Sequence, residues 1–351
     1  MADFFDVAIR CLSATHPDLR RVLKLRAELQ RVAAKARVDL YNLESVFVAA
    51  EMANVLGSLG SLSNDEVEEA PRALQRVISL TIQKSMQFTA RRSGPERSEP
   101  VFQGAAGYLE LVNHLRAHHD RGCAWPSVIT FNYDVGLEMT LIAAGVPYSY
   151  SANGEPDEDS VRIHKLHGSI NWFPIEGSDK VHCPAYTLRG IENYIWKGGL
   201  DRFTLPIERD REHTDDGAAI CHDPLIVPPT DSKLGHRQRM LKVWRAAAVD
   251  LQRATNVAVI GFSLPWTDDF FRHFWAISTI SDQLIDRFVL VDPSRSTHDR
   301  FTQLLAPGVM ERYRWLEGTL LHQIDDLTQL LLGDLPSQAP HGRRQGVRLH
   351  R

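Results

Sequence analysis

The first ninety residues carry a hydrophobic pattern with helical spacing. Apolar residues recur every three or four positions over residues 4–11 and again over 19–32. This spacing predicts two or three packed helices up to about Met52. Turn and capping residues then occupy 61–65, and a further amphipathic helix is expected over 73–88.

A polar segment follows this helical part. Residues 91–100 read RRSGPERSEP, with two prolines and one glycine, which predicts a loop. One more helical pattern covers 107–118. We therefore expect a mainly helical region over residues 1–125, packed on whatever follows it.

The pattern changes character after Pro126. Short apolar, β-branched runs with polar ends predict buried strands at 127–132, 161–166, 225–227, 256–261 and 288–292. Helical patterns over 237–255 and 268–280 separate the last three of these runs. Strands that alternate with helices of this length are typical of an α/β fold, so we expect a Rossmann-like, doubly wound parallel sheet.

The sheet is expected to be interrupted and then followed by a tail. Residues 173–224 are irregular and rich in charge, and either a decorative surface lobe or a functional lid fits this composition. The predicted organisation is a helical region at 1–125, the first sheet strands at 126–172, an insertion at 173–224, the rest of the sheet at 225–333 and a disordered basic tail at 334–351.

Composition narrows the classes of function. The 351 residues hold 40 Lys and Arg against 44 Asp and Glu, a net charge of −4, which disfavours a general electrostatic grip on nucleic acid. No window approaches about 18 consecutive apolar residues, and acidic residues early in the chain do not fit a signal peptide. We therefore expect a cytoplasmic protein without a membrane partner.

The four cysteines stand far apart and form no Cys-x-x-Cys pair. Two His/Cys pairs, at 182–183 and 221–222, could meet around a zinc ion. Adjacent residues rarely ligate one ion together, so we prefer the interpretation that Cys183 and Cys221 are buried thiols.

Polar residues follow several predicted strands. In open α/β sheets ligands bind at the carboxyl ends of the strands, which makes Asn132, Asp134 and His167 candidates for chemistry. Any one of them could instead be a helix cap, a turn former or a structural histidine. His167 precedes Gly168, which would let the backbone turn close to a ligand. His164 should point to the opposite face of the strand, so a His-His metal pair is not expected.

These elements together resemble one known family. The matching segments are Thr130-Phe-Asn-Tyr-Asp134, Lys165-Leu-His-Gly168, the run Trp244, Ala247, Leu251 and Ala254 leading into Val259-Ile-Gly-Phe-Ser-Leu-Pro265 with Asp268 or Asp269, and Val289-Leu-Val-Asp292. In order and spacing they are similar to the sirtuin-like (SIR2) domains of bacterial anti-phage defence systems, over about residues 40–300.

The resemblance implies an NAD site. By this likeness Asn132 would position the nucleophile beside the nicotinamide ribose, Asp134 would contact the carboxamide and His167 would act as general base on a ribose hydroxyl. Further NAD-binding positions would be Thr130, Phe131, Gly261, Phe262, Ser263 near the phosphates, and Asp292 near the adenosine ribose.

The lack of a zinc ribbon distinguishes two reactions that the family resemblance allows, protein deacylation and NAD hydrolysis. Sirtuin deacylases carry a zinc ribbon with two Cys-x-x-Cys pairs, which this sequence lacks. We therefore expect no zinc, and a protein deacylase is the least favoured function. The resemblance instead favours an NAD glycohydrolase (NADase), an antiviral effector that depletes NAD.

A second departure leaves two alternatives open. The family's Gly-Ala-Gly-x-Ser phosphate loop and the strand before it are missing, and Gly104-Ala-Ala-Gly107 fits a helix start better. Ala2-Asp-Phe-Phe5 resembles the segment that follows such a loop. Either the natural start lies upstream, or the protein is an NAD-binding-deficient scaffold of a defence complex. The missing strand would expose a sheet edge.

Effectors of this branch of the family are commonly activated by a sensor protein. We accordingly expect a homo-oligomer or a separate activator, of which an Argonaute-like protein and a HerA-type ATPase are the kinds that the resemblance suggests. No sequence-specific contact with nucleic acid is expected.

Overall fold

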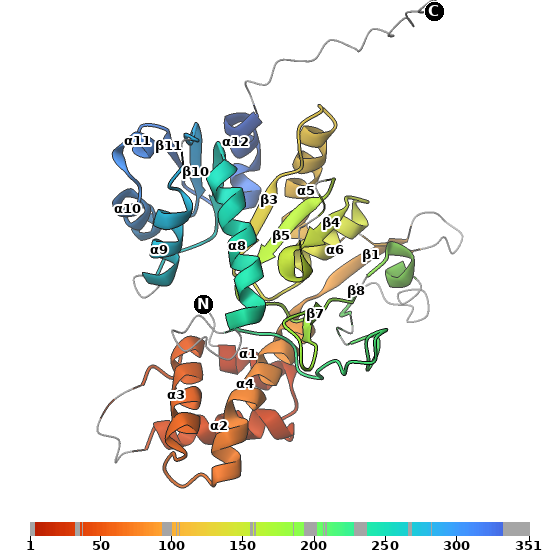
Figure 1. The fold of residues 1–351 in the computed structure, drawn as a ribbon, viewed down its shortest axis with the longest axis vertical. Helices are drawn as coiled ribbons and strands as arrows, with labels where there is room; N and C mark the ends of the chain where they lie inside the picture. Colours follow the sequence, from red (N-terminus) through yellow and green to blue (C-terminus); the bar gives the residue numbers. More distant parts are fainter. Residues whose placement is uncertain are drawn as a thin grey trace, which may run out of the picture.

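The computed structural model describes residues 4–31, 36, 38–92, 100–102, 104, 106–154, 157, 159–184, 186–192, 202–205, 207, 209–227, 237–265, 269–281 and 283–332. Over these residues the protein is a mixed α/β structure with parallel sheets (Figure 1). The expected α/β class is thereby confirmed. The predicted basic tail at 334–351 lies outside the described residues.

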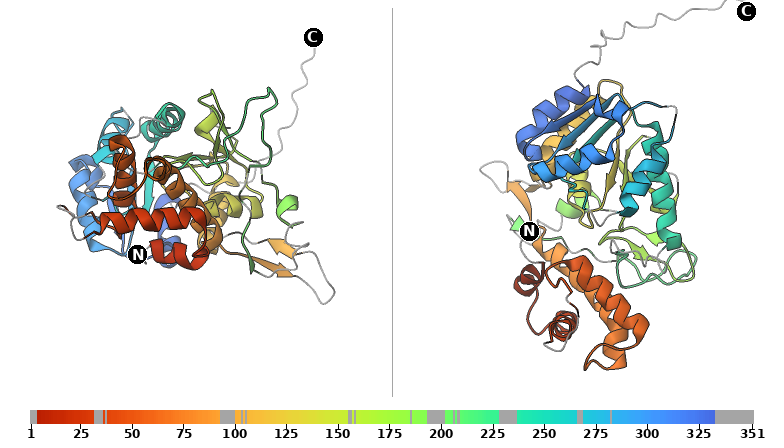
Figure 2. Two further views of the ribbon diagram at one scale, coloured as in Figure 1. Left: turned by 90° about the horizontal axis from the view of Figure 1, so that it is seen from below. Right: turned by 90° about the vertical axis from the view of Figure 1, so that its left-hand side faces the viewer.

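The N-terminal helices form a layer of their own at one end of the molecule (Figures 1 and 2). They are α1 (Phe4–Cys11), α2 (Pro17–Leu29), α3 (Leu43–Leu56) and α4 (Asn64–Ser85). Helix α4 begins nine residues earlier than the apolar pattern suggests, because Ser63 and Glu66 form a capping box that satisfies its first amides. The apolar stripe that α4 presents, including Leu74 and Val77, is fully buried against the other helices.

The prediction of one loop over 91–100 is wrong at both ends. Strand β1 (Phe88–Arg92) pairs antiparallel with β2 (Pro100–Phe102) on one side and with β8 (Arg202–Phe203) on the other. Phe88 and Phe102 are both buried and meet edge to face at 5.6 Å between ring centroids. This aromatic contact between strands distant in sequence outweighs the local polar composition. Residues 93–99 lie outside the described part.

The first parallel sheet has the strand order β3-β5-β4. Its strands are β3 (Ser127–Thr130), β5 (Val161–Lys165) and β4 (Tyr148–Tyr150), and Thr130 lies opposite Lys165 in the register. Helix α5 (Ala106–His119) precedes β3, α6 (Gly136–Ala143) follows it, and the 3-10 turn η1 (Ser151–Asn153) follows β4. Strands β3 and β5 were predicted, whereas β4 has too few residues to produce a recognisable pattern.

The second parallel sheet has the order β11-β10-β9. It comprises β9 (Asn256–Ile260), β10 (Arg287–Val291) and β11 (Tyr313–Leu316) with helices α8 (Arg237–Arg253), α9 (Asp269–Ser278), α10 (Arg295–Leu304), α11 (Pro307–Met310) and α12 (Leu320–Leu332). The predicted helices and the strands at 256–261 and 288–292 are confirmed to within a few residues. Strand β11 was not predicted.

The strand expected at 225–227 is not formed. Ile226 makes only an isolated bridge to Gly168. The neighbouring main chain pairs with the turn after β5 instead, because Ser169 donates to Leu225 and Val227 donates to His167. A short apolar run therefore lines a turn, and its hydrogen bonds are satisfied there rather than in a sheet.

The irregular segment 173–224 is tied to both neighbouring parts. Strands β6 (Phe173–Pro174) and β7 (Val181–His182) form a small hairpin, and Ile175 packs with Ile220 beside it. Leu205 and Ile207 are buried in the same apolar cluster as the N-terminal helices. Within the described residues this insertion therefore bridges the helical layer and the first sheet.

Long apolar helices of the kind that cross a lipid bilayer are not found in the described part of the chain.

Candidate functional site

The turns after β3 and β5 are joined by main-chain hydrogen bonds. Tyr133 accepts from the Ile170 amide at 3.0 Å, and its hydroxyl donates to Val227 at 3.1 Å. Gly168 has φ +81°, and a Cβ there would collide with the Leu225 carbonyl oxygen. Only glycine fits this crossing, which places His167 against the turn after β3.

Asn132 and Asp134 both lie on the turn after β3 but make different contacts. Asn132 is exposed, and its amide N–H donates to Thr130 Oγ1 at 3.1 Å. The Asp134 carboxylate accepts from the Gly136 amide at 2.8 Å, close to the first turn of α6, where a negative group is favoured. Asn132 is thus exposed at this turn, whereas Asp134 helps start a helix.

Tyr108 of α5 reaches the same turn. Its hydroxyl is hydrogen-bonded to the Asn132 side chain. Burial raises the pKa of Tyr108 to about 12, with the negative charges of Asp134 and Glu138 adding to the rise and the Asn132 hydrogen bond opposing it. The phenol therefore stays protonated at neutral pH and orients the Asn132 amide.

A buried ion pair stabilises the turn after β3. Lys165 Nζ lies 2.8 Å from Glu138 Oε1, both side chains are almost fully buried, and the ammonium also donates to the Asp134 carbonyl oxygen. The Tyr150 hydroxyl donates to the same Glu138 oxygen at 3.0 Å. Because each charge is compensated in a low dielectric, this network fixes the main chain at Asp134.

Aromatic rings connect the two sheets beside His167. Phe131 contacts the His167 ring edge to face at 5.0 Å and stacks on Phe262 at 4.7 Å. Phe271 of α9 meets Phe131 at 5.3 Å. His167 itself is 7% exposed. The predicted residues Phe131, Phe262 and His167 therefore lie together, although they come from separate strand ends.

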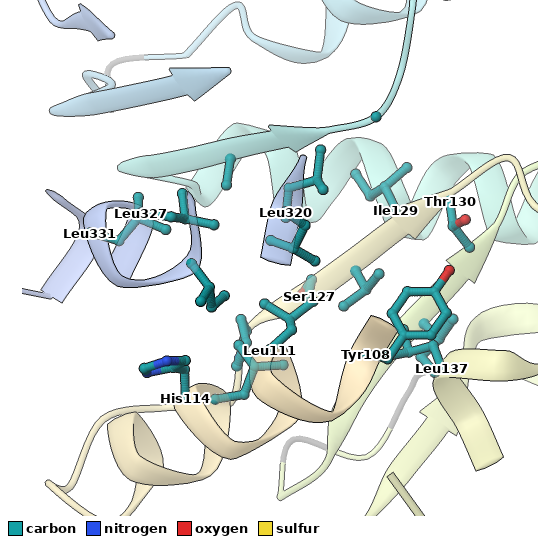
Figure 3. Close-up of a pocket in the computed structure, with 18 of the residues that line it drawn as sticks. Tyr108, Leu111, His114, Ser127, Ile129, Thr130, Leu137, Leu320, Leu327 and Leu331 are labelled. Atoms are coloured by element: carbon teal, nitrogen blue, oxygen red, sulfur yellow. The ribbon is translucent and has the colours of Figure 1, made fainter. Parts of the chain in front are cut away.

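Two cavities flank the strands that carry these residues, and Figure 3 shows the first of them. One has a volume of about 560 Å³ and includes Thr130, Asn132, Asp134 and Gly261 in its lining. The other, of about 550 Å³, includes Phe131 and Phe262 and shares Thr130, Asn132 and Gly261 with the first. Asn132 thus lies where both cavities reach the carboxyl ends of β3 and β9.

The remaining predicted positions lie elsewhere. Ser263 is exposed, and its carbonyl oxygen accepts from Arg300 Nε at 2.7 Å. Asp292 is 7% exposed, and its carboxylate accepts from the Ser294 amide at 2.8 Å before α10. Neither residue lines either of the two cavities; His167 does not line them either, but its ring contacts Phe131, which does. The structure therefore brings together seven of the nine predicted positions, by cavity lining or ring contact.

His164 has a separate environment. Its Nε2 donates to Asp250 on α8 at 2.7 Å, and its Nδ1 lies 2.8 Å from Ser151 Oγ. Burial by itself would raise the pKa of Asp250, but hydrogen bonds from His164 and Ser127 outweigh it and lower that pKa. His164 is fully buried and attaches α8 to β5, whereas Ser127, Arg162 and Asp250 of the same cluster line the second cavity.

The cysteine pairs considered for zinc do not converge. Among the described residues no group of three or more His, Cys, Asp or Glu side chains is arranged to hold a metal ion. His182 pairs instead with Asp210, and burial raises the pKa of the Cys183 thiol to about 12.

Sequence reasoning missed two contributors, Tyr108 and the Lys165–Glu138 pair. Tyr108 stands at the start of α5, twenty residues or more from the motif it supports, and nothing in its local pattern marks it. Lys165 could have been noticed, because a lysine inside an otherwise apolar strand needs a buried partner.

Comparison of the sequence with models of known protein families gives no match, and comparison with curated proteins gives no match either.

Proposed function

We propose that the two parallel sheets are halves of one doubly wound, Rossmann-like sheet with its site at the carboxyl ends of β3, β5 and β9. Support comes from the layers: α12 packs on α5 and β10, while α8 packs on α9 and β5. Helices thereby cover both faces, as in wound α/β proteins. The turns that follow β3, β5 and β9 also converge through Phe131.

On this fold we propose an enzyme that cleaves the N-glycosidic bond of NAD. The observation that carries the proposal is that Phe131, which lines one cavity together with Asn132, contacts the His167 ring, with the three residues in the order that resembles sirtuin-like domains. Each cavity is large enough for part of a dinucleotide and is lined by apolar and polar groups together.

The residues fit a reaction through an oxocarbenium-like state. The C1′–N bond breaks, its electron pair leaves with nicotinamide, and the oxygen of water bonds to C1′ while a proton passes to a base. The Asn132 side chain, oriented by Tyr108, would hold the water or the ribose. His167 would be this base: it would accept the proton of a ribose hydroxyl, which in turn takes up the proton of the attacking water, and would then release its proton to solvent.

The particular role we propose is that of a sirtuin-like NADase effector in anti-phage defence, acting in the cytoplasm. An activator protein or self-assembly would switch it on, with an Argonaute-like protein or a HerA-type ATPase as the kinds of partner that the family resemblance suggests. The substrate is NAD, and water is the second reactant.

Variants of the two central residues test the proposed chemistry. We expect Asn132→Ala and His167→Ala each to slow nicotinamide release from NAD by about 10²–10⁴-fold, the range for removal of a positioned acid–base or orienting group. The rates are measured by chromatography of nicotinamide and ADP-ribose, and thermal unfolding verifies that each variant is folded.

His222→Ala is the matched control. His222 is exposed and lies outside both cavities, so its replacement should leave the rate within about twofold. Equal rates for wild type and His167→Ala would contradict the assigned role of His167. Absence of turnover in every protein, together with no thermal stabilisation by millimolar NAD, would favour the scaffold alternative.

A further inference from the structure

A chain of buried hydrogen bonds begins in the turn after β5, two residues beyond His167. The Ser169 hydroxyl donates to Asn171 Oδ1 at 2.6 Å, and Asn171 Nδ2 donates to the Tyr150 hydroxyl oxygen at 3.2 Å. The Tyr150 hydroxyl in turn donates to Glu138 Oε1 at 3.0 Å. The chain therefore leads from the turn that carries His167 to a carboxylate on α6.

The buried ion pair continues this chain to the turn after β3. Lys165 Nζ lies 2.8 Å from Glu138 Oε1 and also donates to the Asp134 carbonyl oxygen. In addition, the Ile170 amide donates to the Tyr133 carbonyl oxygen at 3.0 Å. Because Tyr133 directly precedes Asp134 and Ile170 belongs to the turn after β5, these bonds close a ring that joins the two turns. We call it the polar ring, and its side chains are those of Glu138, Tyr150, Lys165, Ser169 and Asn171.

Most of the polar ring is inaccessible to water. Ser169 and Asn171 have no exposed surface, and Lys165 and Glu138 are 1% and 2% exposed. Neither Ser169 nor Asn171 lines either of the two cavities. Water therefore cannot replace a partner that is removed from the ring, and each missing bond leaves a buried polar group unpaired.

The direction of each hydrogen bond restricts which side chain fits at position 171. Burial, reinforced by the Glu138 charge, raises the pKa of Tyr150 well above its ordinary value, so the hydroxyl keeps its proton. Tyr150 donates that single proton to Glu138, so its oxygen must accept from residue 171. Ser169 needs an acceptor on the same side chain. An amide supplies both groups, whereas a carboxylate supplies only the acceptor and leucine supplies neither.

We infer that Asn171 is a positioning residue, which holds the turn of His167 against the turn of Asn132 by closing the polar ring. The inference rests on the proposed function, because that reaction needs both side chains at one ribose. Asn171 lies outside the cavities, so it acts through the two turns and not on NAD itself. A misplacement of about 1 Å between reacting groups lowers a rate by about 10²-fold, so the ring should affect turnover more than NAD affinity.

The first test measures the two turns without NAD, by amide hydrogen exchange and mass spectrometry. In Asn171→Leu we expect exchange over residues 132–136 and 167–171 to become at least about tenfold faster than in wild type, because the ring is open. Exchange over 288–291 of β10 should stay the same. Gln83→Leu is the matched control, since it also replaces an amide by leucine and removes a hydrogen bond, from Gln83 to the Leu205 carbonyl, outside the ring.

The second test measures nicotinamide release under conditions in which the wild type is active. We expect Asn171→Leu to lower kcat by about 10–100-fold and to leave KM within about threefold, because Asn171 positions the reacting groups without contacting NAD. Gln83→Leu should stay within about twofold of wild type in both constants.

The conservative variant Asn171→Asp separates positioning from space filling. Burial beside Glu138 raises the pKa of the introduced carboxyl group above its ordinary value of about 3.9. Below that raised pKa the protonated group donates to Tyr150 and accepts from Ser169, as the amide does. We therefore expect its kcat relative to wild type to rise at least about fivefold as the pH falls from about 9 to about 5. The ratio for Asn171→Leu should stay constant, because leucine does not titrate.

Three results would overturn the inference. They are equal exchange over 132–136 in wild type and Asn171→Leu, an unchanged kcat in Asn171→Leu while the wild type is active, and an Asn171→Asp ratio that does not depend on pH. If no protein releases nicotinamide under any condition, the proposed function fails, and the exchange measurement still decides whether Asn171 holds the two turns together.

Discussion

At the scale of single residues, Gly168 determines how the candidate site is formed. It follows His167 directly, has a positive φ and leaves no room for a side chain beside the Leu225 carbonyl. The sequence suggested that glycine would let the backbone turn at this point. The structure adds the partner that makes glycine necessary, which no local pattern could reveal, because Leu225 lies 57 residues further along the chain.

Replacement of this glycine gives the first prediction at this scale. Gly168→Ala combines a strained φ with a clash against main chain, so we expect it to lower the free energy of unfolding by about 3 kcal/mol or more. Gly177→Ala is the matched control, since Gly177 has φ +66° with open space around it, and should cost about 1 kcal/mol. Urea unfolding measures the free energy of unfolding of both variants. Similar losses of stability would contradict the close approach of Gly168 to the Leu225 carbonyl.

The Cys183 thiol allows a second residue-scale prediction. Because burial raises its pKa to about 12, the thiolate that reacts with alkylating agents is scarce at pH 8. We expect iodoacetamide to modify Cys183 at least tenfold more slowly in the folded protein than in urea. Mass spectrometry of the labelled peptides gives the rate, and rapid labelling in the folded state would show that the thiol is accessible.

At the scale of elements, the contact between α8 and β5 depends on one carboxylate. The Asp250 carboxylate accepts hydrogen bonds from His164 at 2.7 Å and from the Ser127 hydroxyl, and it forms an ion pair with Arg162 at 3.3 Å. The helix was predicted from its apolar spacing, which gives its length and buried face. The histidine was predicted to point away from His167, but its bond to α8 depends on a tertiary approach between residues 86 positions apart.

This cluster predicts how stability changes with acid. The folded pKa of Asp250 is lowered, so its contribution is fully present above the unfolded value of about 3.9 and is lost as pH falls through the folded pKa. Asp250→Asn should lose about 3 kcal/mol at pH 7, because it leaves the Arg162 charge without its partner. The difference from wild type should shrink as the pH falls below the unfolded pKa of Asp250 and through its lower folded pKa. Urea unfolding across this range would contradict the account if the difference stayed constant.

At the scale of the whole molecule, Arg76 connects the helical layer to the site. It pairs with Asp18 of α2 at 2.9 Å and with Asp223 at 3.2 Å, just before the segment that meets the turn after β5. It also pairs with Glu69 on its own helix. The three carboxylates come from well-separated parts of the chain, so this arginine holds the N-terminal layer in place.

We therefore expect Arg76→Met to lower the free energy of unfolding by about 1–3 kcal/mol, because Asp18 is buried and would lose its main cationic partner. Arg211→Met is the matched control. Its partner Asp215 is almost fully exposed, and the change should stay within about 0.5 kcal/mol. Thermal unfolding of both proteins decides the matter, and equal shifts would show that Arg76 is not a structural link.

Much of the fold follows from pattern alone, and the limits of that prediction are physical. The sequence pattern predicts long amphipathic helices such as α4 and α8, and it predicts apolar strands such as β10. Strands β1 and β4 do not, because their stability comes from distant partners. The turns with Asn132 and His167 were found as motifs, while Tyr108 and the Lys165–Glu138 pair were missed because only the folded chain brings them to the site.

The most direct test of the account is a time course of NAD with the purified protein, alone and extended upstream in frame, with cell lysate from phage-infected bacteria added to supply an activator. The account predicts that nicotinamide and ADP-ribose appear in equal amounts in at least one of these conditions, and that Asn132→Ala abolishes both products. NAD that stays intact in all of them, or product formation that is unaffected by Asn132→Ala, would contradict it.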